Sequence, residues 1–213
     1  MPVSGLKVEA VTLERGGRVV IDNLSFNVSA GDALVLTGSN GAGKTTVIRA
    51  LAGFLTPTSG TIHLVGAADD QELPSLCHYV GHRDATKAKL TVAENVAFWA
   101  AYLGGPANAT ARTESTDAAL DAFGLADLAA VPAGYLSAGQ KRRLGLARLL
   151  SAPRPFWLLD EPTTALDAEH QRAFAVLIEQ HRATGGMVIA ATHMDLGLAN
   201  ARSLHLAARG ANE

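Results

Sequence analysis

A glycine-rich stretch early in the chain has the residue types and spacing for phosphate chemistry. Residues 38–45 read Gly-Ser-Asn-Gly-Ala-Gly-Lys-Thr and match the pattern G-x-x-x-x-G-K-[ST], between a run typical of a strand and a run typical of a helix. Its glycines let backbone N–H groups approach phosphates, and a helix N-terminus favours negative charge. We predict that this stretch, the phosphate loop, binds a magnesium nucleoside triphosphate. The predicted binding residues are Gly38, Ser39, Asn40, Gly41, Ala42, Gly43, Lys44, Thr45 and Thr46.

Three side chains at the end of the phosphate loop have separate predicted roles. We expect Lys44 to contact the β- and γ-phosphates, Thr45 to ligate Mg²⁺ and Thr46 to reach the α-phosphate. A chance glycine turn is the alternative. Average residue usage makes a random match in a chain of this length about a one-in-a-hundred event, and the flanking strand and helix patterns reduce it further.

Two consecutive carboxylates follow a second apolar run, Phe156-Trp-Leu-Leu159. Such a run is typical of a buried parallel strand, which delivers Asp160 and Glu161 at its C-terminal edge. We predict that Asp160 holds Mg²⁺ or its water, together with Thr45, and that Glu161 polarises the attacking water. Taken alone, Asp-Glu-Pro also fits a polar turn. Downstream of a phosphate loop the catalytic interpretation is favoured.

Two further segments suggest a catalytic role only in combination with the phosphate loop and the carboxylate pair. Leu136-Ser-Ala-Gly-Gln140 either starts a helix through a capping box or directs that helix N-terminus, with Ser137 and Gly139, at the γ-phosphate of a second nucleotide. His193 follows an apolar run at 187–191. It either donates to the γ-phosphate, orients the water, or has a structural role.

In this order, the motifs resemble those of the ATPase subunits of ABC transporters over essentially the whole chain. The matching segments are the phosphate loop, residues 136–140, Asp160-Glu161, Thr164-Ala-Leu-Asp167 and His193. The resemblance implies that two subunits sandwich two ATP molecules, and that hydrolysis reopens the dimer. It implies that Ser137, Gly139 and Gln140 of each copy complete the other copy's site. Asp167 would lie in the loop that couples the sites, and Glu161, His193 and Lys44 would be the catalytic residues.

Four segments narrow the resemblance to the haem-exporter ATPases of cytochrome c maturation, the CcmA type. They are residues 37–46, Tyr79-Val-Gly-His82, Leu90 to Phe98 and Leu136 to Arg143. This resemblance implies separate polytopic membrane subunits, a peripheral position on the cytoplasmic side of the bacterial inner membrane, and a chain that does not itself contact haem. The alternatives are an ABC ATPase subunit for another cargo (a lipid, a peptide or a metal chelate) and a soluble, non-transport ABC ATPase.

Two positions depart from the family pattern. The glutamine that usually contacts Mg²⁺ corresponds to Arg83, which cannot ligate a cation. We expect Arg83 to sense nucleotide or partner instead. The aromatic residue that usually stacks on adenine is missing from residues 12–17, where Arg15 either stacks its guanidinium plane on the base or is an exposed turn residue.

Composition excludes several other classes. A net charge of -2 leaves no broad basic field for a nucleic acid. The N-terminus lacks the pattern of a secretory signal, and no apolar stretch is long enough to cross a membrane. The single cysteine, Cys77, suits a reducing compartment and a half-buried strand position. A GTPase or small-molecule kinase would leave residues 136–140 unexplained.

The pattern of apolar and turn residues predicts an α/β P-loop NTPase of ABC type. We expect a mixed-sheet nucleotide core with a β-rich N-terminal part, about 1–84 and 151–213, and an inserted helical subdomain, about 85–150. Phe98 and Trp99 in that subdomain either pack in its core or receive a membrane partner's helix. Predicted strands are 7–13, 19–28, 33–36, 61–65, 78–81, 156–159, 187–191 and 203–206. Predicted helices are 45–54, 90–103, 115–123, 137–150 and 167–181.

Overall fold

The computed structural model describes residues 3–68 and 70–207. The chain forms two compact units, which are described separately below. The first unit comprises Met1–Tyr79, Pro155–Pro162 and Leu177–Glu213, and the second comprises Val80–Arg154 and Thr163–Val176. The predicted helical subdomain, 85–150, falls within the second unit.

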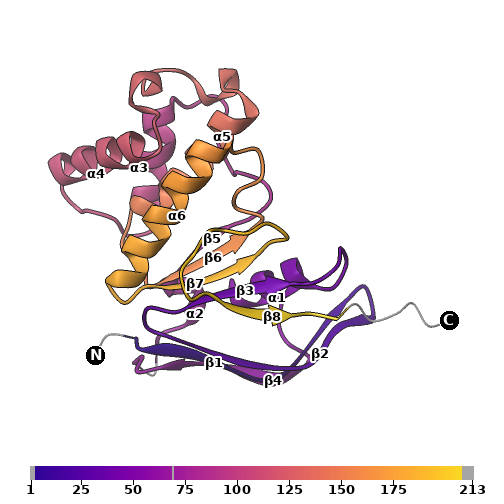
Figure 1. The fold of residues 1–213 in the computed structure, drawn as a ribbon. Coiled ribbons are helices and arrows are strands. Elements are labelled where there is room, and N and C mark those ends of the chain that lie inside the picture. The colour runs from indigo at the N-terminus through magenta and orange to yellow at the C-terminus, as the bar shows by residue number, and fades with distance from the viewer. Residues whose placement is uncertain (1–2, 69, 208–213) are drawn as a thin grey trace. The chain divides into compact units, whose positions relative to one another are not determined.

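Three long strands form an antiparallel sheet in the first unit. They are β1 (Gly5–Arg15), β2 (Arg18–Ser29) and β4 (Ser59–Val65), in the order β2-β1-β4 (Figure 1). Leu6 and Val8 face the core, and the buried set then shifts by one residue to Val11 and Leu13. Ala10, at φ 49°, lies where the register shifts, because a bulge reverses the alternation of side chains. The β-rich N-terminal part is therefore confirmed.

The remaining strands form a five-stranded sheet in the order β5-β6-β7-β3-β8. They are β3 (Ala33–Thr37), β5 (Cys77–Val80), β6 (Phe156–Asp160), β7 (Met187–Ala191) and β8 (Arg202–His205). β3 pairs in parallel with both β7 and β8, and β6 pairs in parallel with β7. Every residue of β6 and β7 is buried, as expected for parallel strands covered on both faces.

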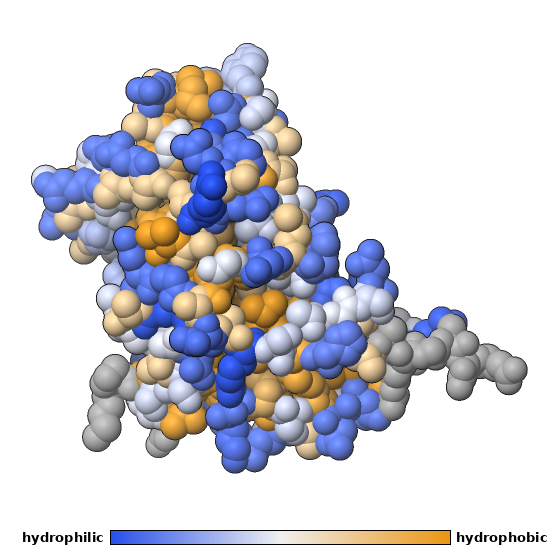
Figure 2. Space-filling model, in the orientation of Figure 1, coloured by the Kyte–Doolittle hydropathy of each residue, from blue (hydrophilic) through white to orange (hydrophobic). Residues whose placement is uncertain are grey.

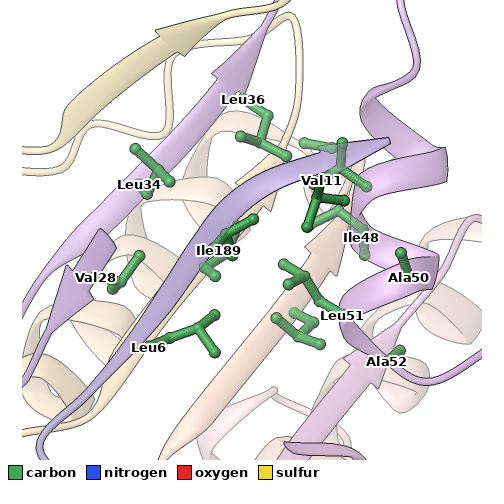
Figure 3. Close-up of a cluster of buried hydrophobic side chains, with 14 of the residues drawn as sticks. Leu6, Val11, Val28, Leu34, Leu36, Ile48, Ala50, Leu51, Ala52 and Ile189 are labelled. Carbon is green, nitrogen blue, oxygen red and sulfur yellow. The ribbon is translucent and has the colours of Figure 1, made fainter. Parts of the chain in front are cut away.

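The core of the first unit lies around helix α1 (Lys44–Leu51). Figure 3 shows side chains of α1 converging with those of β1, β3 and β7. Alternate residues of β6 serve the two faces of the sheet: Leu158 joins this core, whereas Trp157 stacks on His181 with ring centroids 4.0 Å apart. His181 belongs to helix α6 (Ala168–Ala183). The two faces of the sheet thus hold the phosphate-loop helix and the end of α6.

Two local predictions in the first unit are corrected by the structure. Helix α1 ends at Leu51 rather than Phe54, because Gly53 adopts φ 79° and the Phe54 N–H turns back to the Arg49 carbonyl. A short helix, α2 (Leu73–Leu76), was not predicted. Four residues are too few to show helical periodicity.

The second unit is helical. It contains α3 (Val92–Tyr102), α4 (Ala109–Ala122), α5 (Ala138–Ala147), the 3₁₀ turns Ala126–Leu128, Ala133–Tyr135 and Arg148–Leu150, and residues 168–176 of α6. The predicted capping boxes of α3 and α5 are both present. The predicted start of α4 at Ser115 is wrong. Asn108 accepts a hydrogen bond from the Ala111 N–H, so the helix begins at Ala109.

The surface is mixed in character. Figure 2 shows hydrophilic side chains spread across the visible face, with hydrophobic areas small and scattered between them. Within residues 3–68 and 70–207, no helix has the length and hydropathy needed to span a membrane.

Candidate nucleotide-binding site

The phosphate loop has a backbone that glycine makes possible. Gly38, Gly41 and Gly43 have φ angles of 134°, 85° and 94°, a region that residues with a Cβ rarely adopt. A Cβ on Gly43 would also come within 2.6 Å of Ile21 Cδ1. The chain therefore approaches β2 closely and leaves a cradle of backbone groups at the start of α1.

The N-terminus of α1 is open to an anion. Gly43 is its N-cap, so no side chain caps the first turn, and no acidic residue lies there. Its first N–H groups have no acceptor within the helix and point towards the loop. The buried Lys44 ammonium donates to the carbonyls of Gly38, at 2.7 Å, and Ser39, at 3.1 Å. This arrangement concentrates positive potential inside the loop, which fits the phosphates of a nucleotide.

Thr45 and Asp160 meet at the other side of the loop. The Thr45 hydroxyl donates to Asp160 Oδ1 at 3.0 Å, although 115 residues separate them. Asp160 is the last residue of β6 and is only 3% exposed. A hydroxyl and a carboxylate are hard oxygen donors of the kind Mg²⁺ prefers. The predicted metal-binding pair thus has suitable chemistry, and its role stays a prediction.

Glu161 lies one residue beyond β6 in a left-handed conformation, at φ 49°. Its N–H donates to the Ala191 carbonyl at 2.8 Å, which extends the pairing of β6 with β7 by one residue. Its carboxylate accepts from the Thr192 hydroxyl at 3.2 Å, and its other oxygen lies 3.0 Å from His193 Nδ1. A left-handed non-glycine residue costs about 1–2 kcal/mol. Here the strand pairing and these contacts hold the carboxylate in place.

The contact of Glu161 with Thr192 and His193 was missed from the sequence. The three predicted roles of His193, as a donor to the γ-phosphate, in orienting the water or in the structure, stay predictions, and the structure adds a contact of its ring with the Glu161 carboxylate. The signal that could have found it is strand pairing, because Asp160 lies opposite Ala191 and the residues that follow are therefore neighbours. His193 remains 65% exposed, so its other ring nitrogen is accessible.

The signature segment, residues 136–140, lies in the second unit. Ser137 caps α5: its hydroxyl accepts from the Gln140 N–H at 3.2 Å, and its own N–H donates to Gln140 Oε1 at 2.8 Å. A Cβ on Gly139 would lie 3.0 Å from the Ala165 carbonyl, so this position is close-packed. Both interpretations of the segment stay open, because a capping serine still has a proton to donate.

Asp167 directly precedes α6 in the same unit. Its carboxylate accepts from the His170 N–H at 2.9 Å and lies 2.7 Å from the His170 ring. The hydrogen bond from the His170 backbone, followed by the one from its side chain, lowers the pKa of Asp167. The carboxylate is therefore ionised at neutral pH and bound to its own helix. Its predicted role in coupling two sites stays a prediction.

Two arginines lie where the family pattern led us to expect nucleotide contacts. Arg15 is exposed at the turn between β1 and β2, in the first unit. Arg83 is exposed after β5, in the second unit. The loop that carries Arg83 is bound by Arg142 of α5, which donates to the Gly81 carbonyl at 2.9 Å and to Asp84 Oδ1 at 2.8 Å. The structure thus shows how this loop is held, and the roles of both arginines stay predictions.

A glycine-rich phosphate loop opens a helix, and a buried aspartate followed by a glutamate ends a parallel strand beside it. This combination defines the class of P-loop nucleoside triphosphatases. Residues 21–164 match the model of the ABC transporter family. The chain belongs to this family and, within it, to the CcmA group of cytochrome c biogenesis ATP-binding export proteins.

Relatives and solved structures agree with this assignment. A protein of Rhodopseudomonas palustris strain BisB5, named cytochrome c biogenesis ATP-binding export protein CcmA, is 53% identical over 91% of this chain and 94% of its own length. A protein of the same name from Paramagnetospirillum magneticum is 51% identical, with 90% and 89% covered. The ATP-binding cassette MJ0796, solved as a dimer with ADP and Pi, aligns with a TM-score of 0.77 at 25% identity and 94% coverage of both chains. A bacterial Atm1-family ABC exporter with ATP bound, 24% identical, aligns with a TM-score of 0.80 over 97% of this chain and 37% of that one, and shows the fold alone.

Proposed function

We propose that this chain is the ATP-hydrolysing subunit of a membrane ABC export complex that serves cytochrome c biogenesis. The observation that carries the proposal is identity of about half the residues over nearly the full length of relatives named for that role. The geometry of the first unit supports the proposal, because this unit holds the phosphate loop together with the Thr45-Asp160 pair and Glu161. Hydrolysis of ATP supplies the mechanical step.

In this mechanism the phosphate loop binds the triphosphate through its backbone N–H groups and the Lys44 ammonium. Thr45 and Asp160 would hold Mg²⁺, directly or through its water, and the bound ion would supply positive charge beside the phosphates. Glu161 accepts the developing proton of the attacking water. The contacts from Thr192 and His193 orient the Glu161 carboxylate and leave His193 Nε2 accessible to the γ-phosphate.

The active form in this proposal is a dimer on the cytoplasmic side of the membrane. Ser137, Gly139 and Gln140 of one copy close over the γ-phosphate bound by the other copy. The dimeric state of the MJ0796 cassette with ADP and Pi supports this arrangement. Separate polytopic membrane subunits bind the pair, and the partly exposed Phe98 and Trp99 on α3 are candidates for that contact.

Haem is the proposed cargo of the complex, and this chain does not itself contact it. The proposal rests on the cytochrome c biogenesis relatives. Deletion of this chain should abolish c-type cytochromes while other exports continue. Normal cytochromes in the deletion strain would remove the haem role and favour another cargo, such as a lipid, a peptide or a metal chelate.

Purification tests the transporter assignment independently of the cargo. The chain should co-purify with polytopic membrane subunits from detergent extracts, and its specific ATPase activity should rise with protein concentration as dimers form. A chain that stays alone and is stimulated by DNA or RNA would instead support a soluble, non-transport ABC ATPase.

A further inference from the structure

One aromatic residue of the chain stands apart from all the others. The sequence has six phenylalanines, two tryptophans and three tyrosines, and all of them lie in the described part of the chain. All but one pack against another ring or against the core of their unit. The packed residues are Phe26, Phe54, Tyr79, Phe98, Trp99, Tyr102, Phe123, Phe156, Trp157 and Phe174. The remaining residue is Tyr135.

The Tyr135 side chain projects from a firmly held backbone. It is 84% exposed, more than any other large hydrophobic side chain of the described residues. Within residues 3–68 and 70–207 its ring has no stacking partner and its hydroxyl no hydrogen bond. Its N–H donates to the Pro132 carbonyl at 3.0 Å, the N–H of Gly134 donates to Ala88 at 2.9 Å, and the next residue, Leu136, is buried. A ring fixed at its base and free at its tip is suited to contact with something outside the chain.

The aromatic residue that the family pattern expects to stack on a nucleotide base is missing from the first unit. Residues 12–17 contain none. Phe54, the exposed aromatic of this unit, lies past the C-terminal end of α1. That helix has eight residues, so about 12 Å separate Phe54 from the loop. The base of a nucleotide in the phosphate loop therefore has no aromatic ring in residues 12–17 to stack on.

We propose that Tyr135 of one copy stacks on the base of the nucleotide held by the phosphate loop of the second copy. This inference rests on the proposed dimer, in which Ser137 faces the partner's γ-phosphate. Tyr135 precedes Ser137 by two residues, which span at most about 7 Å. Together with the length of its own side chain, this spacing is long enough for the ring to reach past the γ-phosphate to the ribose and base.

Stacking on the base can be recognised from which ligands lose affinity when the ring is removed. It depends on the π-face of the base, which adenine and guanine both offer, and it is absent for a triphosphate without a base. Loss of the ring should therefore weaken ATP and GTP alike. It should leave the affinity for inorganic tripolyphosphate unchanged, because the phosphate loop binds that anion alone.

Steady-state hydrolysis by the full chain provides the first test. Tyr135→Ala should raise the KM for ATP about tenfold, equivalent to about 1.4 kcal/mol, with the inhibition constant of tripolyphosphate unchanged. Tyr135→Phe keeps the ring and should stay within about twofold of the native chain. Tyr102→Ala, which removes another largely exposed tyrosine, is the matched control and should behave as the native chain.

Mixed dimers show which copy supplies the ring. A chain carrying Lys44→Ala is paired with a chain that has an intact loop, so each dimer has one working site. Adding Tyr135→Ala to the Lys44→Ala chain should raise the KM of that site about tenfold. Adding it to the chain with the intact loop should leave the KM unchanged. The reverse result would place the ring on its own chain's nucleotide and overturn the proposal.

The outcomes separate this inference from the proposed function. A native chain that neither hydrolyses ATP nor gains activity with concentration contradicts the proposed function. Normal hydrolysis with an unchanged KM in Tyr135→Ala overturns only the stacking role. Equal weakening of ATP and tripolyphosphate also overturns it, because the residue then serves the dimer contact. A raised KM in Arg15→Ala alone would assign the base to Arg15.

Discussion

The phosphate loop and the signature segment are both glycine-containing turns that open a helix, but their N-termini are completed differently. The N-cap of α1 is Gly43, which has no side chain, so the first N–H groups of the helix are open to an anion. The N-cap of α5 is Ser137, which forms a reciprocal capping box with Gln140 and needs no ligand. The N-terminus of α1 is therefore suited to binding an anion, whereas the N-terminus of α5 is already capped and offers only a hydroxyl proton. Affinity for nucleotide should therefore come from the first unit, and turnover should require both.

The largest expected effect is a loss of hydrolysis without a loss of ATP binding, caused by one change in the first unit. Glu161→Gln should lower kcat about 1,000-fold, because an amide cannot accept the proton of the attacking water. ATP affinity should stay within about twofold, since the phosphate loop is untouched. Single-turnover hydrolysis and equilibrium binding of a fluorescent ATP analogue measure the two quantities. Glu169→Gln, an exposed glutamate on α6, is the control. Normal hydrolysis by the Glu161 variant would refute its assignment as the base.

A change in the signature segment should impair turnover by the dimer and leave ATP binding by the single chain intact. Ser137→Arg should lower turnover about 100-fold, because the partner's γ-phosphate loses a hydrogen-bond donor and meets a bulky side chain. Binding of ATP by dilute, monomeric chain should be unchanged. Ser137→Thr retains both cap and hydroxyl and should remain within a few-fold of native activity. Weakened ATP binding by the monomer would mean that the segment serves its own chain's site.

The two units should also differ in how much their ion pairs stabilise them. Arg142 is 4% exposed and Asp84 22%, whereas Lys7 and Glu9 of the first unit are about half exposed. Asp84→Asn should lower the free energy of unfolding by about 2 kcal/mol, because it leaves a buried guanidinium undercompensated. The double variant Asp84→Asn, Arg142→Met should lose less free energy of unfolding than the sum of the losses in the two single variants. Glu9→Gln should leave the unfolding midpoint unchanged. Denaturant unfolding of all four variants gives the comparison.

The smallest expected effect is a pH dependence that belongs to the first unit. Burial against Trp157 lowers the pKa of His181 from 6.5 to about 4. The unfolded chain therefore binds more protons between these values, so the stabilisation is complete above about pH 6.5 and is lost as the pH falls towards 4. The melting temperature of the native chain should drop by more between pH 7 and pH 5 than that of His181→Gln. Equal drops would show that other groups cause the acid sensitivity.

Local features of the fold were predictable because they depend on adjacent residues. They are the glycines of the phosphate loop, the capping boxes at Thr91 and Ser137 and the apolar run 156–159, each visible in a short window of sequence. The late predicted start of α4 shows the limit of this reasoning. The Asn108 cap comes directly after Gly104-Gly105-Pro106-Ala107, a stretch typical of a loop, and the α4 sequence that follows has no clear apolar face to show where the helix begins.

Contacts between distant segments were not predictable in the same way. Glu161 and His193 are 32 residues apart, and they meet because β6 and β7 pair in a particular register. Arg142 and Asp84 are 58 residues apart, and neither position suggests the other. Such pairs depend on how strands and helices pack, which a single sequence does not specify by local pattern.

The sequence by itself determined the class of chemistry. The phosphate loop has three glycines that adopt positive φ, followed by a lysine and a threonine. Together with a carboxylate pair at the end of a strand, this set of residues predicts phosphate chemistry and few alternatives. Tertiary structure decided how the groups act on each other: that Thr45 donates to Asp160, that His193 holds Glu161, and that Tyr135 is the one aromatic of the described chain without a packing partner. The reason is physical. Backbone conformation and capping are set by neighbours along the chain, whereas orientation, burial and exposure are set by neighbours in space.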